Sequence, residues 1–98
     1  MELHTLTELQ YAEPEKDGSY KLYIYGRDGY HSGAKWFRNK VKYPDEEITS
    51  EEARKLVKEA MGKKKEIRIT DGGDNIVYHA ANGAVLYPDT AEDFWSKI

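Results

Sequence analysis

The segment TSEEARKLVKEAMGKKK, residues 49–65, constrains the fold most, because its pattern is typical of one kind of element only. Thr49 and Glu52 have the spacing of a capping box, with Ser50 as a competing N-cap. Gly62 stands where a left-handed residue often ends a helix. Apolar residues recur at helical spacing, namely Ala53, Leu56, Val57, Ala60 and Met61. We therefore expect an α-helix over about residues 50–61 that packs one apolar stripe against another element.

Segments in which polar and apolar residues alternate precede this helix and predict β-strands. In SYKLYIYG, Tyr20, Leu22 and Ile24 share one face. The opposite face carries Lys21, Tyr23, Tyr25 and Arg27. In KWFRNKVKY, the residues expected on that same opposite face are Trp36, Arg38, Lys40 and Lys42. The glycine-rich GRDGYHSGA between the two segments is expected to form a long hairpin loop. Residues 3–12 fit either a strand or a short helix.

The chain after the helix predicts more strands and a second helix. KEIRIT is expected to form a strand, DGGDN a turn, and IVYHAANGAVLYP a tight hairpin turning at Asn82-Gly83. PDTAEDFWSKI predicts a short helix capped by Thr90, with Phe94, Trp95 and Ile98 available for packing. The 98 residues make one domain, 1–98, of the α+β class. We expect a twisted, mainly antiparallel sheet with the main helix across one face.

The stretch from Tyr20 to Tyr43 has a composition unlike the rest of this acidic chain. It carries six Lys/Arg and one acid in a protein of net charge −3, together with five of the eight tyrosines. A helix covers only one face of a small sheet, so Tyr23, Tyr25 and Trp36 are expected on the other face beside basic residues. Such a face suits protein contacts, stacking of nucleic-acid bases, or simple stabilisation of an open sheet.

The acidic segment YPDEEITSEE, which contains Asp45, Glu46 and Glu47, has two interpretations. Part of it caps the predicted helix. The remaining acids are either solvated, which is the commoner case, or form loops that imitate nucleic-acid phosphates toward a basic protein.

Residues for catalysis or metal binding are not arranged in any recognisable motif. The chain has no cysteine, which excludes disulfides and thiolate sites. The histidines, His4, His31 and His79, do not stand at metal-ligand spacing, and His79 fits a structural residue of a strand. We expect no catalytic residue, no metal site, no cofactor and no enzymatic activity. No apolar run is long enough for a membrane span and no secretory signal is visible, which favours the cytoplasm.

In size, acidity, lack of cysteine and strand–helix–strand order, the chain resembles the small anti-defence proteins of phages and mobile elements, the anti-CRISPR proteins among them. That resemblance implies a stoichiometric inhibitor that binds a protein or a protein–nucleic-acid assembly. The contacts it implies are acidic loops and exposed aromatic residues, here Asp45, Glu46 and Glu47 with Tyr23, Tyr25 and Trp36. The basic residues Arg38, Lys40 and Lys42 depart from a pure DNA mimic.

The sequence therefore predicts a non-catalytic binding protein that contacts a protein partner through the aromatic and basic sheet face. One alternative is a nucleic-acid-binding domain that uses the same face. A second alternative is a homodimer in which two copies bury that face against each other.

Overall fold

The computed structural model describes residues 10–14, 19–26, 28–30, 35–37 and 47–97, and it has an α+β fold. Its sheet of six strands has the order β3-β2-β1-β4-β5-β6 and is mainly antiparallel, with β2 and β3 as the parallel pair. The strands are β1 (Tyr20–Tyr25), β2 (Lys35–Phe37), β3 (Glu47–Ile48), β4 (Glu66–Thr70), β5 (Ile76–Ala81) and β6 (Ala84–Tyr87). The helices are α1 (Ser50–Gly62) and α2 (Ala91–Trp95).

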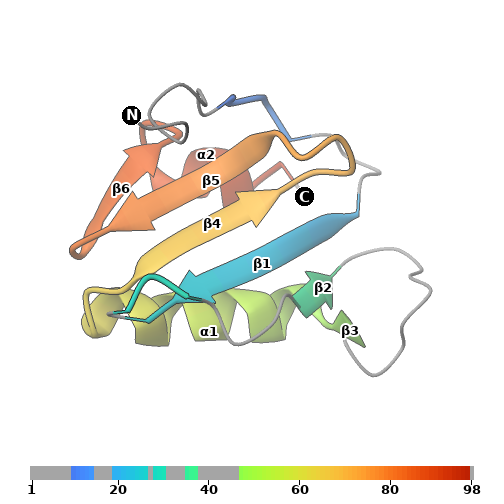
Figure 1. The fold of residues 1–98 in the computed structure, drawn as a ribbon. Helices are drawn as coiled ribbons and strands as arrows, with labels where there is room; N and C mark the ends of the chain where they lie inside the picture. Colours follow the sequence, from blue (N-terminus) through green and yellow to red (C-terminus); the bar gives the residue numbers. More distant parts are fainter. Residues whose placement is uncertain (1–9, 15–18, 27, 31–34, 38–46, 98) are drawn as a thin grey trace, which may run out of the picture.

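Both helices pack on one face of the sheet (Figure 1). The helix α1 contacts β1, β2 and β4, and α2 contacts β5. The apolar side of α1 contributes Ala53, Val57 and Ala60 to the core, as the periodicity of the sequence predicts. From α2, Phe94 is fully buried and Trp95 nearly so. Strand residues fill the space beneath the helices, namely Tyr20, Leu22, Phe37, Ile67, Ile69, Tyr78 and Ala80.

Local capping chemistry sets where the helices begin. Thr49 accepts a hydrogen bond from the backbone of Glu52, whose side chain bonds back to Thr49, so the predicted capping box is confirmed. Thr90 and Asp93 form the same arrangement at α2. The expected role of Gly62 is wrong: Gly62 is the last residue of α1, and the left-handed conformation falls on Lys64, with φ 58°. Three residues, Lys63 to Lys65, connect the end of α1 to the start of β4.

The predicted hairpin between β5 and β6 is confirmed. Asn82 and Gly83 have φ values of 54° and 81°, the pair of positive values that a type I′ turn requires. The pairing of the two strands then shifts: His79 is opposite Tyr87, but Ala80 is opposite Val85. Leu86 is the extra residue at this bulge, and its side chain is exposed.

Two pairings were not anticipated. The sequence predicts an acidic loop at Glu47, but the backbone of this residue lies in β3 and pairs in parallel with Trp36. Residues 10–12 lie beside the start of β5, where the amide of Ile76 donates to the carbonyl of Gln10 and the amide of Ala12 donates to the carbonyl of Ile76. The rest of the ambiguous segment 3–12 lies outside the described residues.

A candidate binding face on the open side of the sheet

The sheet face opposite α1 and α2, called the open face below, presents the side chains that alternate with the core residues. In β1, Tyr20 and Leu22 are buried beneath the helices, so Lys21, Tyr23 and Tyr25 project from the open face. The strand register places side chains of β2, β4 and β5 beside them on the same face. Lys21 is opposite Trp36 of β2, Tyr23 is opposite Arg68 of β4, and Arg68 is opposite His79 of β5.

Trp36, Lys21 and Tyr23 form the first contact group of the open face. The ammonium nitrogen of Lys21 lies 5.0 Å from the ring centroid of Trp36 and 5.8 Å from that of Tyr23. Such cation–π contacts contribute roughly 0.5–1 kcal/mol at exposed positions. The same ammonium lies 3.9 Å from a carboxylate oxygen of Asp74. The positive charge of Lys21 is therefore shared between two rings and an acid at the sheet rim.

Tyr25 and Arg68 form the second contact group. The guanidinium carbon of Arg68 lies 5.3 Å from the ring centroid of Tyr25, and the rings of Tyr23 and Tyr25 are stacked with centroids 6.3 Å apart. Burial raises the pKa of the Tyr25 hydroxyl, while the nearby Arg68 charge lowers it by a smaller amount. Tyr25 is therefore a neutral phenol at physiological pH.

A chain of hydrogen bonds continues from Arg68 to the edge of the open face. Arg68 donates to Oε2 of Glu66, and the same oxygen lies 2.9 Å from Nε2 of His79. On the other side of the imidazole, Nδ1 of His79 lies 3.0 Å from the hydroxyl of Tyr11. A carboxylate can only accept, so Nε2 of His79 donates to Glu66. In the neutral imidazole, Nδ1 then accepts the Tyr11 hydroxyl proton.

The electrostatic state of Glu66 follows from these contacts. Burial raises the pKa of its carboxyl group, but the hydrogen bonds from His79 and Arg68 outweigh burial, and the pKa is lowered overall. Glu66 is therefore ionised near neutral pH. Its charge offsets that of Arg68, so the described part of the open face is much less positive than the sequence stretch from Tyr20 to Tyr43 suggests.

Only part of the expected contact surface can be placed. The structure brings Tyr23, Tyr25 and Trp36 together on the open face, and Glu47 pairs with Trp36 through its backbone. The other candidates lie outside the described residues, namely Arg27, Arg38, Lys40, Lys42, Asp45 and Glu46.

The sequence places Lys21 on this face, but it does not single out the other residues that complete the face, namely Tyr11, Glu66, Arg68, His79 and Tyr87. The alternation within KEIRIT puts Glu66 and Arg68 on the face opposite Ile67 and Ile69. No local pattern indicates that His79 and Tyr11 adjoin them. The prediction that His79 is a hydrogen-bonded structural histidine is confirmed: it is 5% exposed, both ring nitrogens have partners, and the Tyr11 ring contacts the rings of both His79 and Tyr87.

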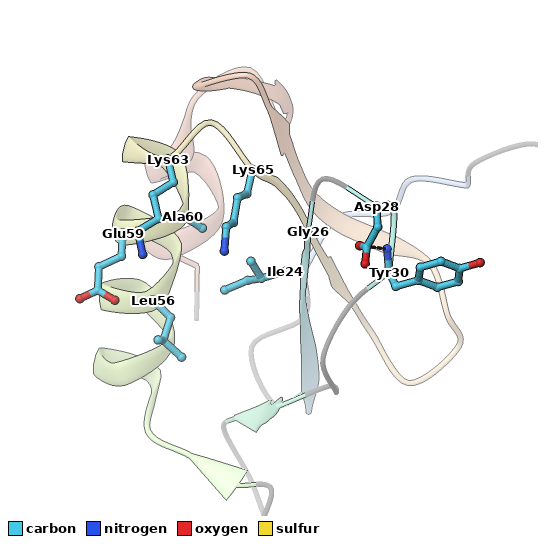
Figure 2. Close-up of a pocket in the computed structure, with 9 residues that line it drawn as sticks. All are labelled: Ile24, Gly26, Asp28, Tyr30, Leu56, Glu59, Ala60, Lys63 and Lys65. Carbon is cyan, nitrogen blue, oxygen red and sulfur yellow. Dashed lines mark hydrogen bonds between the residues drawn. The ribbon is translucent and has the colours of Figure 1, made fainter.

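A separate hollow of about 490 Å³ lies between the second half of α1 and the end of β1 (Figure 2). Ile24, Leu56 and Ala60 form its apolar part, and Lys65 extends toward Ile24. The Tyr30 ring turns away from the hollow, and Asp28 accepts a hydrogen bond from the Tyr30 backbone. Its rim carries lysines and carboxylates, and among its lining residues no nucleophile contacts a base.

The described residues contain no group of three or more His, Asp or Glu side chains that could hold a metal ion. The Tyr11–His79–Glu66 chain of hydrogen bonds joins the segment 10–14 to the sheet. No helix of the described part of the chain is long and apolar enough to cross a membrane.

Comparison of the chain with protein-family models, with curated proteins and with solved structures finds no match.

Proposed function

We propose that this protein is a non-catalytic binding protein that contacts a protein partner through the open face, and that binding itself is how it acts, as in a stoichiometric inhibitor. The observation that carries the proposal is the grouping of Trp36, Tyr23 and Tyr25 on a sheet face that no described helix covers. Each of the three side chains is partly exposed. Tryptophan, tyrosine and arginine contribute most to the energy of protein interfaces.

The charges of the open face favour a protein over nucleic acid. Lys21 already contacts two rings and Asp74, and Arg68 is bound to Glu66. Phosphate contacts require cations that can leave such partners, and nucleic-acid interfaces are strongly positive. An aromatic surface with locally balanced charges matches the centre of a protein interface better.

Nucleic-acid binding is the second candidate function, favoured by one observation. The rings of Tyr23 and Tyr25 are stacked at an interplanar angle of 28°, and aromatic side chains in neighbouring positions of a sheet provide stacking surfaces for bases. This candidate requires affinity for single strands that falls steeply as the salt concentration rises.

The decisive experiment compares the wild-type protein with the double variant Tyr23→Ala/Trp36→Ala as immobilised bait for a lysate, with captured proteins quantified by mass spectrometry. Tyr30→Ala is the matched control, because Tyr30 is an aromatic residue, 77% exposed, outside the open face. We expect a specific partner to bind wild type and Tyr30→Ala equally, and the double variant at least tenfold less. Circular dichroism establishes that the variants are folded.

Three results would contradict the proposal. Equal capture by the double variant would move the interface away from the open face. Salt-sensitive binding of labelled single-stranded DNA or RNA, lost in the double variant, would establish the nucleic-acid function instead. A dimeric mass in solution that becomes monomeric in the double variant would show that the open face is covered by a second copy.

A further inference from the structure

A second candidate site lies in the helix layer, on the side of the sheet opposite the open face. It is an open groove of about 260 Å³ between α1, α2 and β6. Most of its wall is apolar, formed by Val57, Met61, Val85, Ala91 and Trp95. Engineered apolar cavities of about 150 Å³ bind benzene. The groove therefore has room for one aromatic ring with a short substituent.

Tyr78 is the buried polar residue of this groove. Its side chain projects from β5 into the helix layer, where the ring packs against Phe94 and Trp95 of α2. The residue is 1% exposed, and its hydroxyl group forms no hydrogen bond within the described part of the chain. The hydroxyl is not among the fully sealed polar atoms that lack a partner, which is consistent with its reaching the groove. Buried polar groups of native proteins are nearly always hydrogen-bonded. A hydroxyl at the wall of an open groove can satisfy this requirement with water, or with a bound molecule that displaces the water.

Burial also raises the pKa of the Tyr78 hydroxyl. The group consequently keeps its proton throughout the physiological pH range and can donate a hydrogen bond to an acceptor in the groove.

The rim of the groove supplies charge. Arg54 and Lys58 approach it from α1, and Glu92 approaches it from α2. Arg54 forms an ion pair with Glu92 and lies over the Trp95 ring, with its guanidinium carbon 5.8 Å from the ring centroid. Lys58 is exposed and has no ion-pair partner among the described residues. One positive charge is therefore left for a ligand beside an apolar wall.

We propose that this groove binds a small aromatic carboxylate. The ring lies against Trp95, Met61 and the valines, where aromatic and thioether contacts are favourable. The Tyr78 hydroxyl donates a hydrogen bond to a ligand oxygen, and Lys58 attracts the carboxylate at the rim. This inference is independent of the proposed function, because the groove and the open face are on opposite sides of the sheet.

Phenylacetate is a suitable probe, and its neutral analogue phenylacetamide tests the role of charge. A ligand of this size is expected to bind with a dissociation constant on the order of millimolar. Titration followed by nuclear magnetic resonance is expected to give saturable shifts of the Val57, Met61 and Val85 methyl groups and of the Trp95 indole. Phenylacetamide is expected to bind roughly two- to fivefold more weakly.

Three variants test the assignment. Tyr78→Phe removes only the hydroxyl and is expected to weaken phenylacetate binding roughly five- to tenfold. Ala91→Leu fills the groove and should abolish binding. Tyr30→Phe removes a hydroxyl elsewhere and should change nothing. The proposal would be overturned if about 10 mM probe gave no saturable shifts. It would also be overturned if the Tyr78→Phe and Ala91→Leu variants bound phenylacetate as tightly as the wild-type protein does. Equal affinity for phenylacetamide would overturn the assignment to carboxylates.

Discussion

The substitution Glu66→Gln tests the hydrogen-bond chain of the open face. One carboxylate oxygen of Glu66 accepts from both Arg68 and His79. The amide oxygen of glutamine can occupy the same place, so the variant keeps two acceptor contacts and loses the charge. Hydrogen bonds to charged groups contribute roughly 1.5–3 kcal/mol, against roughly 0.5–1.5 kcal/mol for neutral pairs. Because Glu66 is 33% exposed, solvent screening reduces the difference. We expect a loss of about 1–2 kcal/mol in the free energy of unfolding at pH 7.

The pH dependence of this loss gives the sharper test. The pKa of Glu66 is lowered in the folded protein from an ordinary value of 4.5. The ionised carboxylate therefore contributes stability at pH values above 4.5, and this contribution disappears as the pH falls through the lowered folded-state pKa. The difference between wild type and Glu66→Gln should be largest at pH 6–7 and should shrink in strongly acidic solution.

The assay is urea unfolding followed by tryptophan fluorescence, repeated between about pH 3 and pH 7. Glu59→Gln is the control, because Glu59 is an exposed acid of α1. This control variant should track the wild-type protein. A difference between wild type and Glu66→Gln that stays constant down to pH 3, or no difference at pH 7, would refute the view that Glu66 acts as a charged acceptor.

Two further predictions concern stability. Thr70→Val removes a buried hydroxyl that has no hydrogen-bond partner among the described residues; we expect the free energy of unfolding to stay level or rise by about 1 kcal/mol, and a loss of that size in a urea titration would show that the hydroxyl has a partner. Thr49→Ala removes the capping box of α1 and should cost about 1 kcal/mol by the same assay. A variant as stable as the wild-type protein would mean that the cap contributes little to α1.

The sequence alone determined the elements that depend on near neighbours. The spacing of Ala53, Val57 and Ala60 defines the buried side of α1, and the Thr49–Glu52 pair defines its start. Asn82 and Gly83 define the hairpin, because few other residues adopt positive φ at both positions. Alternation in β1 puts Leu22 and Tyr23 on opposite faces of the sheet, and it thereby assigns Tyr23 and Tyr25 to the candidate binding face. All of these signals operate over a few residues, where periodicity and backbone preferences decide the outcome.

Tertiary structure alone decided which of these residues meet. Tyr11 and His79 are 68 positions apart, and their contact depends on residues 10–12 lying beside Ile76. The contact between Glu66 and His79 depends on the pairing of β4 with β5, which no local pattern specifies. The groove at Tyr78 likewise exists because α2 and α1 settle on the same sheet face without filling the space between them. Strand register and helix packing depend on contacts between segments that are distant in the sequence. The charge balance of the open face and the shape of the groove are therefore determined only when the sheet and helices are assembled.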